Sequence, residues 1–180
     1  MNITRREALK EWLIIVVGAT VIPSCKGDET TPSIVLNNLK LEGKEEKLLA
    51  EISETIIPAT ATPGAKDTLA HLFVLRMVDD TYTKEEQVQF VKGMKEFDQL
   101  ARSRFDKSFL DADTAQREQF LTGILNPASK ETPATILSFA KTMKKLTVQG
   151  YMSSKYYLTK VRVYELVPGR YHGCFPVSKA

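Results

Sequence analysis

The sequence predicts an all-α fold, a single bundle of about five helices with an extended C-terminal tail, preceded by a signal peptide and a flexible tether. Two observations predict the bundle. Apolar residues recur at intervals of three and four through most of the chain, and no alternation with a period of two occurs before Gly150. Prolines and capping residues stand where the helices should begin or end. The domain is expected to span residues 45–180 with a single core, roughly the size of one domain.

Residues 1–24 have the pattern of an export signal rather than of a fold element. A basic start is followed by the apolar run from Trp12 to Ile22. That run falls short of the ~20 apolar residues needed to cross a bilayer. Arg5-Arg6 with Leu9 and Lys10 resembles the twin-arginine export signal, although an alanine stands where an aromatic residue is usual. An ordinary basic leader is the alternative interpretation.

Cys25 directly follows the apolar run, in the sequence Ile22-Pro23-Ser24-Cys25. This resembles a bacterial lipobox, in which the cysteine is acylated and becomes the new N-terminus. A chance thiol near a simple cleavage site is the alternative. Several acyl chains anchor a protein stably, so the mature chain is expected on the periplasmic side of a bacterial membrane. Residues 25–44 are predicted to be the tether, because Lys26 to about Asn38 is mostly polar and shows no periodicity.

Charge and cysteine content exclude some functions. The net charge of +3 falls to about +2 without the signal, which holds three basic and two acidic residues. Such a balance gives no argument for binding nucleic acid. If Cys25 carries lipid, Cys174 has no partner in its own chain. Cys174 is then either a buried free thiol or linked to a cysteine of another subunit.

The first two helices are defined by apolar spacing and by proline. The first starts near Glu45 and must end before Pro58, because a proline cannot continue a helix. Pro58 to Ala65 contains Pro63-Gly64 and is predicted to be a loop. The apolar residues are Leu48, Leu49, Ile52 and Ile56 in the first helix and Leu69, Leu72, Phe73 and Met77 in the second.

The third and fourth helices have side-chain start signals. Thr83 with Glu86 matches a capping box, in which the two residues satisfy each other's free backbone N–H groups. Asp113 with Gln116 is a weaker copy of that signal. The third helix should run to about Arg104 and the fourth should end before Pro127. Their apolar residues are Val88, Val91, Met94, Ala101 and Phe105, then Phe120, Leu121, Ile124 and Leu125.

The fifth helix and the tail differ in pattern. Thr132-Pro133 places a capping residue before a proline in the first helical position, and apolar spacing continues to about Gly150. Thr159 to Val167 then alternates polar and apolar residues, which predicts a short strand that ends at Pro168-Gly169. A lone strand is not stable by itself, so its edge is expected to pair with a partner or with another segment.

The sequence offers few groups for catalysis. His71 lies among apolar positions and His172 lies in the tail, and neither has a second ligand at metal-binding spacing. Asp79-Asp80 and Glu85-Glu86 flank a helix connection, where solvated carboxylates favour the next helix N-terminus. The sequence has no phosphate loop and no nucleophile elbow, and Ser153-Ser154-Lys155 lacks the spacing of a serine-lysine hydrolase. The chain is predicted to hold no catalytic residue, cofactor or metal of its own.

The most specific residues lie in the tail and at the end of the first helix. The tail resembles the closing segment of the gluconate 2-dehydrogenase subunit 3 family, and the first loop resembles the opening segment of that family. A twin-arginine signal is also usual there. The resemblance covers roughly residues 45–176, with Tyr157-Leu158 standing where members commonly have a glycine. The residues concerned are Gly150-Tyr151, Ser154, Thr159-Lys160-Val161, Tyr164 and Val167-Pro168-Gly169-Arg170-Tyr171-His172-Gly173-Cys174-Phe175-Pro176, with Ile56-Ile57-Pro58-Ala59 and Pro63-Gly64-Ala65.

The resemblance implies a small, non-catalytic subunit of a membrane-associated flavoprotein sugar or alcohol dehydrogenase. In that family a large subunit similar to glucose-methanol-choline oxidoreductases holds FAD. A cytochrome c subunit with haem c accepts electrons where it is present. The small subunit supplies the export signal and supports the folding and anchoring of the large one. The residues predicted to bind the partner are Tyr151, Tyr164, Pro168, Gly169, Tyr171, Gly173 and Cys174.

Alternatives remain for the chain and for its tail. The tail can serve as a structural cap that folds back on the bundle, which is compatible with docking. The whole chain can be a stand-alone helical envelope lipoprotein that binds a ligand or a protein partner without redox association. An independent enzyme is a weaker alternative, because it requires a convergent polar site that the sequence does not contain.

Overall fold

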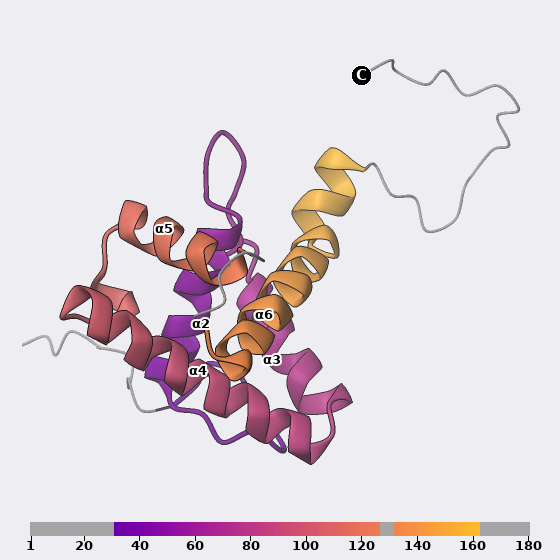
Figure 1. Ribbon diagram of the computed structural model, residues 1–180. Helices are drawn as coiled ribbons and strands as arrows, with labels where there is room; N and C mark the ends of the chain where they lie inside the picture. Colours follow the sequence, from indigo (N-terminus) through magenta and orange to yellow (C-terminus); the bar gives the residue numbers. More distant parts are fainter. Residues whose placement is uncertain (1–30, 127–131, 163–180) are drawn as a thin grey trace, which may run out of the picture.

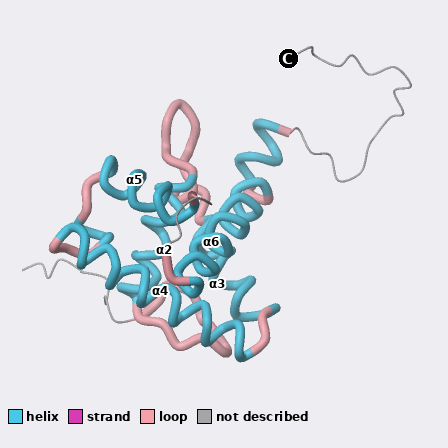
Figure 2. The backbone as a smooth tube through the Cα atoms, viewed as in Figure 1, coloured by secondary structure: helices cyan, strands magenta, loops and turns pink. Residues whose placement is uncertain are grey.

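The structure is a computed structural model that describes residues 31–126 and 132–162 of the 180-residue chain. The described residues form helices and loops and contain no strand (Figure 2). The predicted all-α fold of about five helices is therefore confirmed. The helices are α2 (Gly43–Ile56), α3 (Ala70–Thr81), α4 (Lys84–Phe105), the short 3-10 helix η1 (Phe109–Asp111), α5 (Thr114–Leu125), α6 (Ala134–Met152) and the π-helical turn η2 (Tyr157–Val161).

Helix α6 occupies the centre of the bundle and packs against all four other α-helices. Its most extensive contacts are with α4 and α3, and it also contacts α2 and α5 (Figure 1). The apolar side chains predicted for α6 explain this position, because Ile136, Ala140, Met143 and Leu146 are all buried. The last residues of α6 and the turn η2 extend beyond the other helices (Figure 1).

A cluster of phenylalanines fills one end of the core. The ring of Phe97 lies 5.1 Å from those of Phe109 and Phe120 and 5.6 Å from that of Phe139. Aromatic pairs in such tilted and edge-on arrangements contribute about 0.5–1.5 kcal/mol each beyond the area that they bury. These four residues come from α4, η1, α5 and α6, so the cluster joins elements that are distant in the sequence.

Helices α4 and α6 approach each other most closely at Gly93. A Cβ atom at this position would lie 2.7 Å from the Cβ of Phe139 and 2.9 Å from the carbonyl oxygen of Thr135. Neither atom can move without moving the backbone of α6. Only a glycine therefore permits this approach between the two helices.

The predicted helix starts are largely confirmed. Both capping boxes are present, at Thr83 with Glu86 and at Asp113 with Gln116. The start of α6 differs by one residue, because Pro133 is the capping residue and Ala134 is the first helical position. Val88 was assigned to the apolar face of α4, but it is 64% exposed. Val88 lies on the solvent side of the helix although it stands three residues before Val91, so an interval of three residues did not by itself place it on the buried face.

The described part of the expected tether is packed against the bundle rather than extended as a spacer. The backbone N–H groups of Asn37, Asn38 and Leu39 donate to the Asp79 carboxylate at 2.7, 2.8 and 2.7 Å. Leu39 and Leu41 are buried in the core, and the backbone N–H of Ser33 donates to Glu46 at 2.6 Å. The prediction of a polar spacer to about Asn38 is thus wrong for the described residues. Leu39 and Leu41 directly follow the polar residues, and their burial in the core holds this segment against the bundle.

Asp79 also differs from its predicted role as a solvated cap. It is 1% exposed, while its neighbour Asp80 is exposed. Burial alone would raise the pKa of Asp79, but the three backbone N–H groups and the nearby charge of Arg76 outweigh burial and hold that pKa below its ordinary value. Asp79 is therefore the ionised acceptor that fastens residues 37–39 to α3.

The predicted strand is wrong in its described part. Thr159, Lys160 and Val161 belong to the turn η2, where the amide of Arg162 donates to the carbonyl of Tyr157 at 2.9 Å. A new helical turn starts after the break at Ser153-Ser154, because the Ser154 hydroxyl accepts from the amide of Tyr157 and the Ser154 carbonyl accepts from that of Leu158. The remaining residues of the predicted strand lie outside the described residues.

Among the described helices, none combines the length and apolar character needed to cross a membrane.

The role of Asp79 can be tested with Asp79→Asn, which keeps the shape but places an amide against three N–H donors. The variant should lower the free energy of unfolding at pH 7 by about 1.5–3 kcal/mol, the range for hydrogen bonds to a charged group. Because the folded pKa of Asp79 is lowered, its contribution is complete above the ordinary value of 3.8 and is lost as the pH falls through the folded pKa. Urea unfolding followed by circular dichroism at several pH values measures both effects.

The matched control is Asp80→Asn, at the exposed neighbour. It should change the unfolding free energy by less than about 0.5 kcal/mol, as is usual for surface positions. Equal losses in the two variants would contradict the role assigned to Asp79.

The close contact between α4 and α6 predicts opposite effects for two glycines. Gly93→Ala should lower the free energy of unfolding by about 1–3 kcal/mol, because the added methyl group overpacks the interface. Gly123→Ala in α5 should raise it by up to about 1 kcal/mol, because nothing lies within 4 Å of the added Cβ and alanine favours a helix. Thermal or urea unfolding of both variants checks the prediction, and equal effects would contradict it.

Candidate functional site

The two segments that carry the specific sequence motifs meet at one end of the bundle. The hydroxyl of Tyr151, near the end of α6, donates to the carbonyl oxygen of Pro63 in the loop between α2 and α3 at 3.0 Å. The Tyr151 ring also contacts that of Tyr157, with centroids 6.1 Å apart. Tyr151 and Pro63 are 88 positions apart in the sequence. The junction brings the described parts of both motifs together.

Gly150 allows α6 to come close to α3 just before this junction. A Cβ at Gly150 would lie 3.0 Å from two side-chain carbons of Phe73. The glycine therefore lets α6 pass the Phe73 ring and brings the next residue, Tyr151, to the loop.

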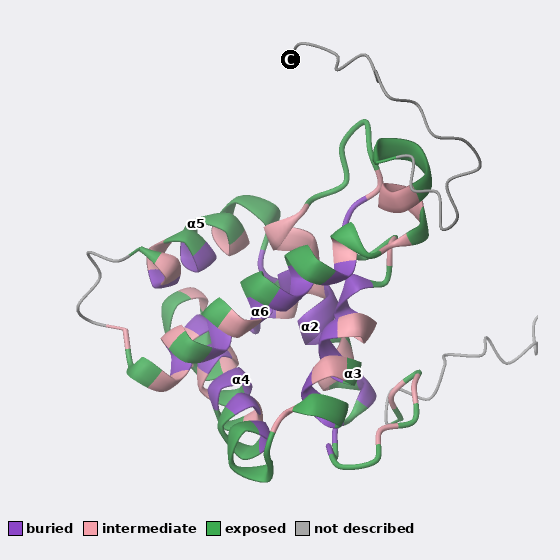
Figure 3. Cartoon of the chain, turned by 90° about the vertical axis from the view of Figure 1, so that its right-hand side faces the viewer, coloured by how far each residue is buried: buried purple, intermediate pink, exposed green. Residues whose placement is uncertain are grey.

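The loop between α2 and α3 is exposed at its tip and held firmly at its base. Residues 58–62 are exposed (Figure 3), while the amide of Ala65 donates to the carbonyl of Ile57 at 2.9 Å and closes the base. The Glu54 carboxylate accepts from the amides of Ala59 and Lys66, both at 2.8 Å. A loop fixed in this way presents a defined surface at little further cost in conformational entropy.

Gly64 is required at the base of this loop. A Cβ there would lie 2.4 Å from Oε1 of Glu54 and 2.7 Å from the backbone nitrogen of Ala59. The glycine thus lets the Glu54 carboxylate reach into the loop and accept both amides. This contact gives a physical reason for the Pro63-Gly64-Ala65 motif.

Leu69 extends the candidate surface beyond the loop. It precedes α3 with φ +57° in the left-handed region, and its apolar side chain is 55% exposed. A non-glycine residue pays roughly 1–2 kcal/mol to adopt this conformation. The prediction that Leu69 lies on the apolar face of the second helix is wrong, because the residue precedes the helix and its side chain is exposed. An exposed leucine held in a strained conformation beside an ordered loop is a candidate binding residue.

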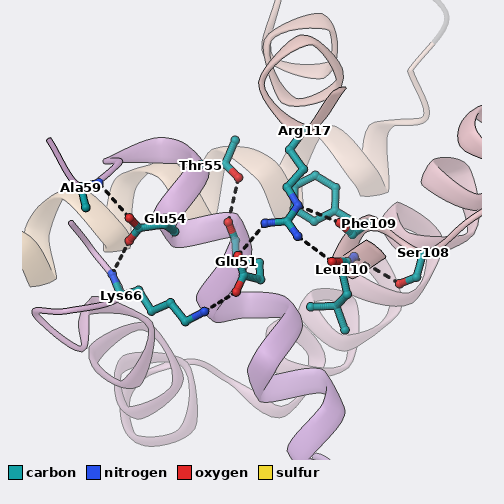
Figure 4. Close-up of polar contacts among 9 residues, drawn as sticks. All are labelled: Glu51, Glu54, Thr55, Ala59, Lys66, Ser108, Phe109, Leu110 and Arg117. Carbon is teal, nitrogen blue, oxygen red and sulfur yellow. Dashed lines mark hydrogen bonds and ion pairs between the residues drawn. The ribbon is translucent and has the colours of Figure 1, made fainter. Parts of the chain in front are cut away.

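A partly buried cluster of charged side chains lies next to the base of the loop (Figure 4). Glu51 of α2 accepts from Lys66 and, at 2.6 Å, from the guanidinium of Arg117 in α5. The same guanidinium donates to the carbonyls of Phe109 at 3.0 Å and Leu110 at 2.6 Å. Burial by itself would raise the pKa of Glu51. The hydrogen bonds and charges of Lys66 and Arg117 outweigh burial and hold that pKa below its ordinary value, so Glu51 stays ionised at neutral pH.

His71 is the one described histidine, and it lies inside the bundle. It is 6% exposed and its Nδ1 atom has no hydrogen-bond partner. Burial lowers the pKa of His71, and the charge of Glu46 only partly opposes this effect, so the ring is neutral at pH 7. The described residues contain no group of three or more His, Cys, Asp or Glu side chains that could hold a metal ion. What this end of the molecule offers chemically is shape, apolar surface and fixed hydrogen-bonding groups.

An open groove lies on the outer side of α4. It has a volume of about 810 Å³ and runs between residues 37–40 and the helix. Its floor includes Val88 and Val91, and lysines including Lys84 and Lys92 surround it. Lys92 and Glu96 pair at 3.8 Å, so the charge of the rim is partly neutralised. The groove lies away from both sequence motifs.

The structure places only one of the predicted partner-binding residues. Tyr151 is half-buried and anchors the junction, whereas Tyr164, Pro168, Gly169, Tyr171, Gly173 and Cys174 lie outside the described residues. The export-signal residues Arg5, Arg6, Leu9 and Lys10 and the predicted lipidation site Cys25 also lie outside them.

Sequence reasoning did not find the supporting residues of the junction. Glu54, Glu51 and Arg117 have no local signature, because their partners lie up to 66 positions away. The only available signal was Pro63-Gly64, which marked a turn but not the carboxylate that the turn accommodates.

Comparison with known proteins agrees with the position of both motifs. The family model for gluconate 2-dehydrogenase subunit 3 matches residues 43–169, which include α2 to η2 and both ends of the junction. No curated protein and no solved structure is similar enough to this chain to count as a match. The family match covers most of the chain, and the chain therefore belongs to the gluconate 2-dehydrogenase subunit 3 family.

Proposed function

We propose that this chain is a non-catalytic accessory subunit of a membrane-associated flavoprotein sugar or alcohol dehydrogenase. The partner is a large FAD-bearing subunit similar to glucose-methanol-choline oxidoreductases, together with a haem c subunit in complexes that contain one. Family membership supports the subunit role. The observation that carries the proposal is the junction of Tyr151 with Pro63, because it joins the two motif segments into one surface.

The large subunit docks on that end of the bundle. The ordered loop at residues 57–65, the exposed side chain of Leu69 and the aromatic pair Tyr151 and Tyr157 form its described part. Interfaces rely on a few apolar and aromatic anchors surrounded by near-neutral contacts. A loop that is already fixed loses little entropy on binding. The predicted tail residues from Tyr164 to Cys174 complete the surface.

The remaining parts of the proposal concern export and anchoring. A flavoprotein folds around FAD in the cytoplasm, so a subunit with a twin-arginine signal can carry it across the membrane already folded. Arg5, Arg6, Leu9 and Lys10 supply that signal in the proposal, and acylated Cys25 anchors the complex on the periplasmic side. The bundle itself supports the folding of the large subunit.

The docking surface can be tested with Leu69→Gly. Glycine adopts a positive φ freely, so relief of roughly 1–2 kcal/mol offsets its own entropic cost of about 0.5–1 kcal/mol, and the fold should not lose stability. Loss of the leucine side chain should nevertheless weaken co-purification of the large subunit about tenfold, which corresponds to ~1.4 kcal/mol. Quantitative pull-down with flavin absorbance, beside urea unfolding of the isolated chain, measures both.

Asp106→Gly is the matched control. Asp106 is the other described non-glycine residue with a positive φ, +54°, and it caps the end of α4. This variant should retain the flavoprotein fully. Unchanged binding by Leu69→Gly would remove Leu69 from the interface. Failure of the native chain to retain any flavoprotein would favour the stand-alone lipoprotein instead.

Export can be tested with Arg5→Lys combined with Arg6→Lys. The double variant keeps the charge of the leader but should leave both this chain and its large subunit in the cytoplasm. Cell fractionation with immunoblotting measures the distribution, and Cys25→Ser in the same experiment should let a high-salt wash release the exported chain from membranes, whereas the acylated chain should resist that wash. Normal export of both proteins in the double variant would mean that the general secretion route is used.

A further inference from the structure

The outward face of α6 has an unusual charge distribution. From Ala134 to Arg162 the chain has six basic residues and no acidic residue. None of the six forms an ion pair with another described residue, whereas Lys66, Lys92 and Lys95 elsewhere in the bundle pair with glutamates. The basic residues are Lys141, Lys144, Lys145, Lys155, Lys160 and Arg162.

The basic residues of α6 share one side with its exposed apolar residues. Lys141, Lys144, Lys145, Val148 and Met152 recur at intervals of one, three and four, which places them on a single face of the helix. Val148 is 37% exposed and Met152 is 43% exposed. The opposite face holds the buried core residues, so this cationic face, defined by these five residues, points to solvent.

The turn η2 extends the cationic face. A shallow hollow joins Lys145, Val148 and Met152 of α6 to Leu158 and Arg162. Leu158 is half-buried there and Val161 is 54% exposed. The end of α6 and η2 also extend beyond the other described helices (Figure 1).

We propose that the cationic face of α6 binds directly to the surface of an anionic lipid bilayer, with Val148 and Met152 entering the headgroup region. Basic residues near an anionic membrane strengthen binding about fivefold each, and apolar side chains add to this by burial. Protein interfaces are depleted in lysine and enriched in aromatic residues, and this face has the opposite composition. The proposed contact uses residues other than those of the flavoprotein junction and does not depend on a lipid at Cys25.

The test uses the chain from residue 25 with Cys25→Ser, so that neither the leader nor an acyl chain contributes. The probe is a vesicle of phosphatidylcholine with about one-third phosphatidylglycerol, at about 0.1 M salt, where charges within ~10 Å still interact. The triple variant Lys141→Gln, Lys144→Gln, Lys145→Gln should bind at least about tenfold more weakly. Circular dichroism confirms that each variant is folded.

A matched control neutralises three lysines of α4, as Lys84→Gln, Lys92→Gln, Lys95→Gln. It should weaken vesicle binding less than about threefold, because Lys92 and Lys95 are paired with glutamates. Equal losses in both triple variants, or equal binding of the native chain to vesicles of phosphatidylcholine alone, would overturn the proposal.

Insertion of the apolar residues has its own readout. Trp12 is the only tryptophan of the sequence and is absent from the tested chain, so an introduced tryptophan reports alone. The fluorescence of Met152→Trp should shift to shorter wavelength when anionic vesicles are added. That of Val88→Trp, at an even more exposed position on α4, should not shift. If the α6 triple variant binds vesicles normally but no longer retains the flavoprotein, the face is a protein interface and the proposal is wrong.

Discussion

The whole bundle depends on how closely α4 can approach α6. Gly93 removes the side chain that would separate them, and the backbone of α6 then lies against that of α4. This approach positions Phe139 beside Phe97, around which the rings of η1 and α5 gather. Because α6 also contacts α2 and α3, its position relative to α4 sets the place of every other element.

The two surfaces on α6 follow from that central position. A helix that contacts every other helix on one side still has one face that no element covers, and that face here carries only positive charge. Its C-terminal end passes the core and reaches the loop between α2 and α3, where Tyr151 meets Pro63. The proposed protein junction and the proposed membrane face thus lie on the same helix, and the packing of that helix in the core fixes their orientation relative to each other.

Most of the helical framework could be predicted from local signals. Both capping boxes, the proline that ends α2 and the apolar spacing of α6 involve residues within a few positions of one another, and such patterns report local structure directly. The errors arose where distant contacts decide the outcome. Asp79 has its hydrogen-bond partners about 40 residues away, so its burial has no local signature.

Leu69 and the beginning of the tail show two other limits of sequence reasoning. Apolar spacing does not distinguish a first helical turn from a residue just before it, and Leu69 is therefore exposed although its spacing fits. Alternation over Thr159 to Val167 predicted a strand, but Ser154 caps a new helical turn just before these residues, and its described part is helical. The junction of Tyr151 with Pro63 required the tertiary fold, because neither residue indicates the other.

The three hydrogen bonds to Asp79 have a mechanical consequence. Residues 37–39 are fastened to α3 before the chain enters α2, so tension that has passed the exposed contact of Ser33 with Glu46 reaches this carboxylate before it reaches the start of α2. Consecutive amides that share one acceptor resist a pull together, whereas a helix end yields one turn at a time. The core helices are consequently shielded from strain that arises upstream, and the molecule can be held by its N-terminal end while its opposite surfaces keep their shape.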